Sequence, residues 1–432
     1  MTAIILILLL IWGIREKYEK IFFIFIFINL VIPLNTNLES KILFLDNNVL
    51  DTRLWVLIFM IILMIIKKSN LNFRTNINQT IFIGVFICLT AVGVLIGYKN
   101  NNIYLINDTK LFIKWIITYF VFFQWIILFK IDYKKVLRGF VVGGFIYACL
   151  TIVLYLFFRG SFLISIYGPI YGSIWADRIT FPNNTAQYVV IFISFYLVYK
   201  KEKIKFNVFS IILNFISIFL SQNRTLIIIG TAMFILTSII FFILGILKRK
   251  ITLQFLGFTF ISIPILLFIA AFISRTSFFK SNTLVKQIID RFSNEGLGTV
   301  SYRIYTNEYA IRSVNSPILG DGLGKALMSG GMSFNRYLVS FVDNAFINIY
   351  AKLGLVGLVM LFLFFFYSLY ANLRAYIKSR NELYLIFILI IPGYIILSCY
   401  MTSQFLHSAP VYLAYFLFII LPDYINGSLK KN

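Results

Sequence analysis

Three arginines lie where polar segments meet long apolar runs, and arginine at such a boundary is suited to binding phosphate. Arg178 precedes an apolar run, Arg224 lies in a short turn between two apolar runs, and Arg303 lies in a long polar segment. The guanidinium group stays charged and grips two phosphate oxygens at once. The alternative role for each residue is an anchor at the level of lipid headgroups. A cluster of three on one face of a membrane favours a phosphate site.

A carboxyl group is the next candidate for chemistry. Asp343 stands beside Asn344, directly before an apolar run near the C-terminal end of the chain. Asp343 is a candidate general base if burial raises its pKa. Its alternative role is the N-cap of the helix that follows. Asp177 and Glu308 are weaker acid–base candidates, for which the alternative is a solvated helix face.

The sequence offers no pattern of metal ligands. The single histidine, His407, lies at the edge of an apolar run, and the three cysteines lie singly inside apolar runs, where they behave as small hydrophobic residues. The glycine-rich string at 320–325 does not match the P-loop pattern and is interpreted as a flexible hinge. We therefore expect neither a metal nor a cofactor.

Composition identifies the elements that must position these residues. The chain has 432 residues, of which 60% are hydrophobic and 13% are charged, whereas soluble domains carry about 25% charged residues. Runs of about 20 apolar residues span a bilayer as helices, and the runs lack the alternation of barrel strands. The sequence predicts an all-α, polytopic integral membrane protein with one transmembrane domain over residues 1–432.

The apolar runs predict 12 or 13 membrane spans, depending on whether the short first run is counted. They are separated by short linkers, with one long exception. The expected spans lie near residues 2–14, 20–34, 54–66, 79–98, 110–129, 136–158, 184–199, 206–222, 224–247, 252–273, 342–370, 383–401 and 408–422.

Lysine and arginine predict the orientation. Basic linkers alternate with poorer ones, and the positive-inside rule places the basic linkers in the cytoplasm. This pattern also accounts for the formal net charge of +23 without nucleic-acid binding, because no basic face recurs in a soluble domain. The basic linkers lie at 67–74, 130–138, 200–205, 248–250 and 374–380.

The long polar segment at 274–341 is then an extracytoplasmic loop. It holds eight basic residues against four acidic ones, although long loops translocate regardless of charge. A cationic outer pocket suits an anionic ligand such as a phosphate or diphosphate. The basic residues are Arg275, Lys280, Lys286, Arg291, Arg303, Arg312, Lys325 and Arg336.

Two short helices are expected inside this loop. Apolar residues at helical spacing between 284 and 292 predict an amphipathic helix at the membrane surface. A second helix is expected from about Ser301 to Val314, where Asn315, Ser316 and Pro317 would end it. Loops of this length commonly form lids or binding loops.

The order of these features resembles that of the Wzy-type polysaccharide polymerases and O-antigen ligases of bacterial envelopes. The resemblance begins at about residue 80 and covers most of the chain. It is carried by three short motifs, namely Arg178-Ile-Thr-Phe-Pro-Asn183-Asn184, Ser221-Gln-Asn-Arg224-Thr, and the stretch from Tyr302-Arg303 through Asn315-Ser-Pro-Ile-Leu-Gly-Asp-Gly-Leu-Gly324 to Asp343-Asn344 and Gly354-Leu-Val-Gly357.

The resemblance implies a membrane glycosyltransferase acting on undecaprenyl-diphosphate-linked glycans without a metal, at the outer face of a bacterial cytoplasmic membrane. An acceptor sugar hydroxyl would displace the diphosphate of the donor, with the bilayer, a flippase and a chain-length regulator as further partners. Asp343 and Arg303 would be catalytic. The residues expected to bind substrate are Arg178, Arg224, Asn183, Asn344 and Arg312.

One departure from the family pattern favours a polymerase over a ligase. Ligases of this family place a histidine directly before the asparagine that Asn344 matches, and Asp343 stands there in this chain. The arginine-to-glycine repeat motifs described for some polymerases are not evident, so no residue roles are carried over from them.

Two functions of other classes compete with the polymerase. A flippase or secondary transporter of lipid-linked sugars would show internal repeats and charges at the middle of the spans, whereas the charges here gather at the predicted outer surface. An envelope scaffold would tolerate substitution of the outer arginines.

Overall fold

The computed structural model describes the chain in eight segments. These segments cover residues 11–13, 15–31, 52–67, 77–157, 184–221, 223–247, 297–329 and 337–428. Three of the expected helices fall outside them, namely most of the first span, the span near 252–273 and the surface helix near 284–292.

The described part of the chain is helical apart from one small hairpin. The elements are α2 (Tyr18–Val31), α4 (Thr52–Lys67), α5 (Ile77–Lys99), α6 (Leu105–Leu128), α7 (Tyr133–Phe157), α9 (Asn184–Tyr199), α10 (Ile204–Leu220), α11 (Arg224–Leu247), α15 (Leu297–Arg312), β1 (Leu327–Ser329), β2 (Tyr337–Val339), α16 (Ala345–Ser379), α17 (Glu382–Ile395), a π-helical turn η2 (Ile396–Tyr400), α18 (Gln404–His407) and α19 (Ala409–Ser428).

The apolar runs fold as the helices that their length and composition predict. In the described segments, six helices are long and apolar enough to cross a membrane. They lie at Ile81–Lys99, Leu105–Leu128, Tyr133–Val153, Thr225–Ile246, Ala345–Ser379 and Glu382–Tyr400. The shorter α4, α9, α10 and α19 are also apolar. These helices confirm the all-α class and favour a membrane protein.

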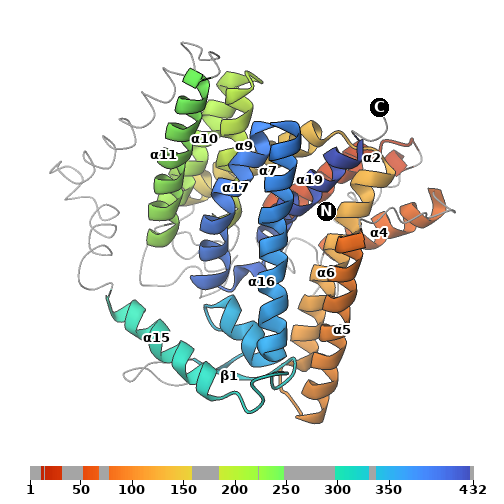
Figure 1. The fold of residues 1–432 in the computed structure, drawn as a ribbon, viewed down its shortest axis with the longest axis vertical. Coiled ribbons are helices and arrows are strands. Elements are labelled where there is room, and N and C mark those ends of the chain that lie inside the picture. Colours follow the sequence, from red (N-terminus) through yellow and green to blue (C-terminus); the bar gives the residue numbers. More distant parts are fainter. Residues whose placement is uncertain are drawn as a thin grey trace.

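Most of these helices run along the long axis of the molecule. Figure 1 shows α5, α6 and α16 on one side, α9, α10 and α11 on the other, and α17 between them. Large aromatic side chains fill the interior, where Trp125, Tyr188, Tyr394 and Tyr415 are buried. Large apolar side chains also point outward along α5 and α11, which suits contact with lipid rather than water.

Polar side chains join α9 to α10 inside the bundle. Ser194 donates to Ser210 at 3.3 Å, and Gln187 donates to Asn214 at the same distance. All four side chains are buried. Small and amide side chains let membrane helices pack closely and satisfy each other's polar groups, so this interface is a structural seam.

Three of the five expected basic linkers, those near 130–138, 200–205 and 374–380, lie close together at one end of the bundle. Glu202 lies 2.8 Å from Arg138 and 3.4 Å from Lys134, while Lys200 lies 2.6 Å from Glu382. These ion pairs join the linkers that follow α6, α9 and α16. The expected basic linkers at 67–74 and 248–250 lie almost wholly outside the described residues, so the sidedness of the bundle stays a prediction.

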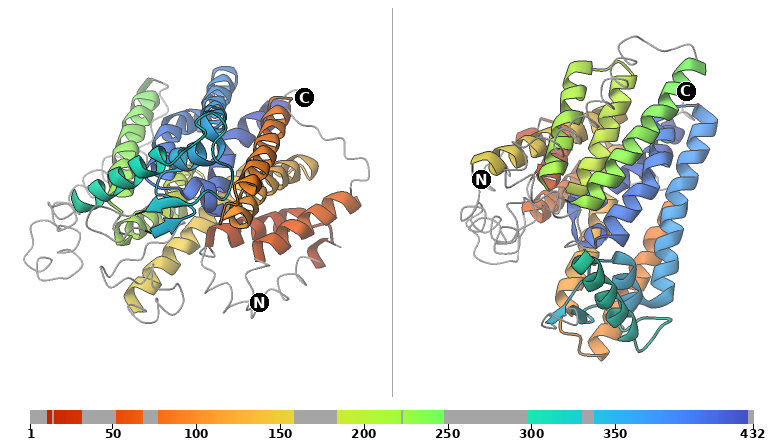
Figure 2. Two further views of the ribbon diagram at one scale, coloured as in Figure 1. Left: turned by 90° about the horizontal axis from the view of Figure 1, so that it is seen from below. Right: turned by 90° about the vertical axis from the view of Figure 1, so that its left-hand side faces the viewer.

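The opposite end carries α15 and the hairpin. Figure 2 shows both below the bundle, and β1 pairs antiparallel with β2, with Met328 opposite Leu338. The predicted second loop helix is confirmed as α15, which starts slightly earlier, at Leu297, and ends at Arg312 before the turn at Asn315. Ala310 packs with Leu327 and Ile347 in a small buried cluster, so α15 is fixed against both β1 and α16.

Candidate functional site

The start of α16 in the candidate site is capped by a side chain. The side chain of Asn344 accepts hydrogen bonds from the backbone N–H groups of Phe346 and Ile347, at 3.0 and 3.2 Å. Asparagine is a preferred N-cap because its oxygen satisfies N–H groups that lack helical partners. The alternative considered for Asp343 was therefore wrong by one position, and Asp343 remains available for another role.

Asp343 faces Arg303 of α15. The carboxylate Oδ2 lies 3.6 Å from the guanidinium Nη2, and both side chains are substantially exposed, at 61% and 43%. An exposed pair of this kind contributes little to stability. Because Asp343 is exposed, the burial that would favour a general-base role has to come from a substrate that covers its carboxylate.

A buried ion pair lies behind this exposed one. The ammonium group of Lys352 in α16 lies 2.6 Å from Oδ2 of Asp108 in α6, and both side chains are fully buried. The hydroxyl of Ser340 and the backbone N–H of Gly324 also donate to the Asp108 carboxylate. Removing one partner of such a pair leaves an uncompensated buried charge.

The segment 340–342 is held from α16 by the same group of residues. Lys352 donates to the backbone oxygen of Ser340 at 2.7 Å and lies 3.5 Å from the centre of the Phe341 ring. The side chain of Asn348 exchanges two hydrogen bonds with the backbone of Val342. Since this segment leads directly into Asp343 and Asn344, the buried residues fix the position of the exposed pair.

The glycine-rich string is a rigid insertion rather than the hinge expected from its composition. Backbone N–H groups of Asp321 and Gly322 donate to α16 at 2.9 and 3.1 Å, and that of Leu323 donates to Gly93 in α5 at 2.8 Å. Gly320, Gly322 and Gly324 all have positive φ, which residues with a Cβ rarely adopt. Glycine is required at these positions because the backbone adopts positive φ and passes close to the backbones of α16, α5 and α6.

Gly354 completes the insertion from the side of α16. Its φ of 67° interrupts the helix, and the kink lets Leu355 and Val356 donate to the carbonyl groups of Pro317 and Ile318. A Cβ built on Gly354 would overlap the Ile318 carbonyl oxygen. The first two turns of α16, which carry Asn348 and Lys352, are thus set apart from its long apolar part.

Asp321 organises the turn that follows α15. Burial alone would raise the pKa of its carboxyl group, but hydrogen bonds from Lys325 and from the backbone N–H groups of Asn315 and Ser316 hold that pKa below its ordinary value. The Lys325 ammonium lies 2.7 Å from the carboxylate. Asp321 is therefore ionised and fully engaged within the protein.

The structure brings only some of the expected residues together. Arg303, Asp343 and Asn344 lie around the junction of α15 and α16. Arg312 forms an exposed ion pair with Glu308 on α15, at 3.6 Å, and Arg224 is the first residue of α11. The side chain of Arg224, together with Arg178 and Asn183, lies outside the described residues.

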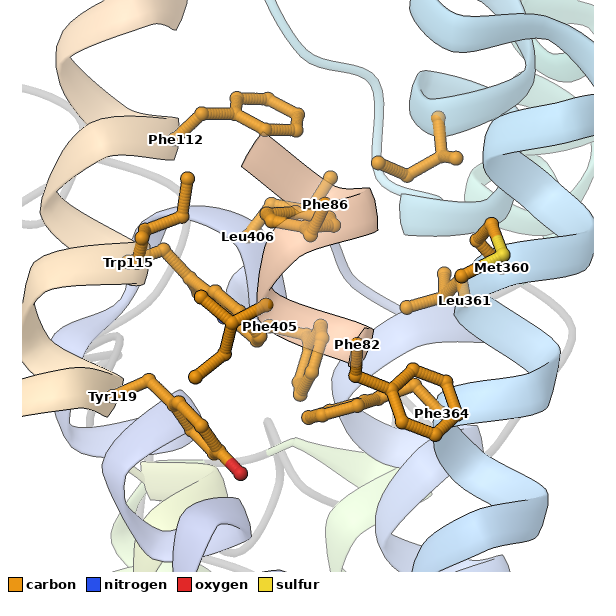
Figure 3. Close-up of a pocket in the computed structure, with 13 residues that line it drawn as sticks. Phe82, Phe86, Phe112, Trp115, Tyr119, Met360, Leu361, Phe364, Phe405 and Leu406 are labelled. Carbon is orange, nitrogen blue, oxygen red and sulfur yellow. The ribbon is translucent and has the colours of Figure 1, made fainter. Parts of the chain in front are cut away.

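An apolar cavity opens between α5, α6, α16 and α18. Its volume is about 710 Å³ when the open space at its mouth is included, and Figure 3 shows Phe86, Trp115, Tyr119 and Phe364 among the side chains that line it. The indole N–H of Trp115 has no hydrogen-bond partner among the described residues. Aromatic and aliphatic lining of this kind accommodates an apolar chain.

Asp108 and Lys352 were not among the residues expected at the site, although the sequence position of Lys352 is a signal. Lys352 lies inside an apolar run that was expected to span the membrane, and an ionisable residue at such a position is a candidate for function or for a buried partner. Asp108 falls between the spans expected near 79–98 and 110–129, but it lies in the first turn of α6. In the described residues, no group of three or more metal-ligating His, Cys, Asp or Glu side chains occurs.

The chain was compared with known protein families and with curated proteins. No family model matches it, and no curated protein matches it.

Proposed function

We propose that the chain is a membrane glycosyltransferase that polymerises undecaprenyl-diphosphate-linked oligosaccharide repeat units at the extracytoplasmic face of a bacterial cytoplasmic membrane. The observation that carries the proposal is the exposed Arg303–Asp343 pair, held at 3.6 Å beside the capped start of α16 and at the end of the bundle opposite the basic linkers. This pair offers a phosphate-binding cation and a proton acceptor side by side.

The proposed reaction uses both groups. A hydroxyl oxygen of the acceptor sugar forms a bond to the anomeric carbon of the donor while the bond from that carbon to the diphosphate breaks. Asp343 accepts the hydroxyl proton and later releases it to water. Arg303 stabilises the negative charge on the departing lipid diphosphate. Positioning and charge stabilisation supply most of the rate in such a scheme.

Two further features support a lipid-linked substrate. The apolar cavity lined by Trp115 and Phe364 provides surface for a polyprenyl chain, and the basic residues expected in the loop 274–341 suit a diphosphate. The buried Asp108–Lys352 pair fixes the segment that carries Asp343, which keeps the reacting groups in place.

Substitution of Arg303 tests the proposal in cells that make the glycan. Arg303→Ala should abolish long-chain glycan while the level of the protein in the membrane stays normal. Arg374→Ala is the matched control, because Arg374 is an exposed arginine near the opposite end of α16. Unchanged chain length in Arg303→Ala would remove this arginine from the site.

Asp343→Asn separates the two roles. The amide cannot accept the hydroxyl proton, so the rate of transfer should fall by about 100-fold or more while donor binding changes much less. Rates and donor affinity measured on purified protein give both numbers. A defect confined to donor binding would make Asp343 a contact residue rather than a base.

A further inference from the structure

A second pocket opens near the end of α5, between the turn that follows α5 and the segment that follows α15. Its empty volume, including its open mouth, is about 1090 Å³. Polar side chains from these separate parts of the chain line it, namely Lys99, Asn100, Asn102, Asn315, Ser316 and Lys325. None of these residues takes part in the proposed transfer.

The amide side chains of this pocket are fixed in one orientation. Asn100 and Asn102 donate through Nδ2 to the backbone oxygen of Asp321, each at 3.0 Å, and Asn102 also donates to that of Leu323 at 2.9 Å. Asn315 donates through Nδ2 to the Asp321 carboxylate at 3.4 Å. All three nitrogens are therefore used within the protein.

The amide oxygens remain as acceptors. In the described residues, the Oδ1 atoms of Asn100, Asn102 and Asn315 accept no hydrogen bond. A ligand rich in hydroxyl groups supplies the donors that these oxygens lack. Inorganic phosphate and diphosphate carry mainly acceptor oxygens at neutral pH and would face three further acceptors.

The charge of the pocket calls for one negative group on the ligand. Lys325 is neutralised by Asp321 at 2.7 Å, whereas exposed Lys99 has no ion-pair partner in the described part of the chain. The two ammonium groups disfavour a metal cation at the same oxygens. Ile96 and Leu319 add apolar surface suited to the C–H face of a sugar ring.

We infer that this pocket binds an acidic saccharide, with Lys99 binding its carboxylate and the oxygens of Asn100, Asn102 and Asn315 accepting its hydroxyl groups. A role as the acceptor-glycan subsite rests on the proposed function, but the binding itself does not. Backbone hydrogen bonds from Asp321 to α16 and from Leu323 to α5 fix one wall of the pocket, so little ordering is needed on binding.

The test is calorimetric binding to the full chain in lipid nanodiscs. The probes are a disaccharide of glucuronic acid and N-acetylglucosamine, the neutral disaccharide with glucose in place of glucuronic acid, inorganic pyrophosphate, and Ca²⁺ alone. The acidic disaccharide should bind saturably and more tightly than the neutral one. Lys99→Gln should weaken it by about 10-fold, equivalent to one charge-assisted hydrogen bond.

Matched variants keep the test specific. Lys110→Gln, at an exposed lysine in the first turns of α6, should leave binding unchanged, and Lys99→Arg should retain most of it. Arg303→Gln should also retain it, which separates this inference from the proposed function. The same disaccharide attached to undecaprenyl diphosphate should show the same dependence on Lys99.

Three outcomes would overturn the inference. One is the absence of saturable, Lys99-dependent binding of the acidic disaccharide. Another is pyrophosphate binding that Lys99→Gln weakens while disaccharide binding is unaffected, which would make the pocket a phosphate site. The third is Ca²⁺ binding that Asn315→Ala abolishes without affecting the disaccharide.

Discussion

Two ion pairs, one exposed and one buried, each include a residue near the start of α16. These residues are Asp343 and Lys352. Arg303–Asp343 is exposed and separated by 3.6 Å, whereas Asp108–Lys352 is fully buried and separated by 2.6 Å. An exposed pair opens readily to admit a ligand, and a buried pair stays closed because unpaired charges are costly to bury. The exposed pair can therefore contact a substrate, whereas the buried pair fixes the position of the segment that leads to Asp343.

Asp321 gives a prediction about pH. Its pKa is lowered in the folded protein, so its stabilising contribution is present above the unfolded pKa of about 4 and is lost as pH falls through the folded pKa. Asp321→Asn should therefore lower the apparent melting temperature at pH 7, and its difference from the natural protein should shrink towards pH 3. Fluorimetric melting of both proteins across that range measures the difference.

A constant difference from pH 7 to pH 3 would contradict the prediction. It would mean that the carboxylate charge of Asp321 is not what stabilises the turn at Asn315 and Ser316. Lys110→Gln is a suitable control, because Lys110 is exposed and lies outside this turn.

At the scale of single residues, the sequence did not predict which side chains contact one another. Asp343 and Arg303 were chosen independently for their chemistry, and the structure places them together. Asn344, expected to contact substrate, uses its side-chain oxygen to cap α16, and its contact with substrate stays a prediction. Asp108 was missed because its partners, Ser340 and Lys352, lie more than 200 residues away, and no periodic pattern encodes such a contact.

At the scale of elements, the segment 320–324, inserted between α5 and α16, determines the geometry of the end of the bundle that carries α15. Its backbone bonds to α5 and α16 replace the side-chain packing that normally separates helices. The side-chain amide of Asn102 donates hydrogen bonds to three backbone oxygens of this segment, those of Asp321, Gly322 and Leu323. A loop held in this way positions both α15 and the start of α16.

Substitution of Gly354 tests this insertion. Gly354→Ala should lower the apparent melting temperature strongly, because positive φ alone costs about 1–2 kcal/mol and the added methyl group overlaps the Ile318 carbonyl. Gly84→Ala is the control, since nothing lies within 4 Å of the position of its Cβ and alanine favours helix. Equal melting temperatures for both variants would contradict the account.

The buried pair can be tested by a double-mutant cycle. Asp108→Asn and Lys352→Met should each destabilise the protein by roughly 3–5 kcal/mol, because each leaves one buried charge without its partner. The double variant should recover much of that loss. Chemical denaturation in detergent measures the three changes, and additive losses would show that the two residues do not interact.

Helix positions were the most predictable part of the fold. The expected spans at 184–199 and 224–247 coincide with α9 and α11, because the change from apolar to charged residues is abrupt at their ends. The span expected at 342–370 is α16, which starts at Ala345 and extends to Ser379. Its final turns are helical although Arg374 and Lys378 make them polar. The three-residue strands β1 and β2 are too short for any periodic signal.

At the scale of the whole molecule, the two ends differ in chemistry. One end joins basic linkers through Glu202 and Glu382. The other carries Arg303–Asp343, the polar pocket at Lys99 and the insertion. Apolar helices join the two ends, so a lipid-linked substrate would have its chain against the helices and its head among these groups.

The most direct test of the proposed function is reconstitution. Purified protein in liposomes would receive an undecaprenyl-diphosphate-linked repeat unit without nucleotide or added metal, and the products would be sized on a gel. A ladder of multiples, lost in Arg303→Ala and kept in Arg374→Ala, is the predicted result. Movement of the substrate between leaflets without any ladder would contradict polymerisation and make the protein a transporter.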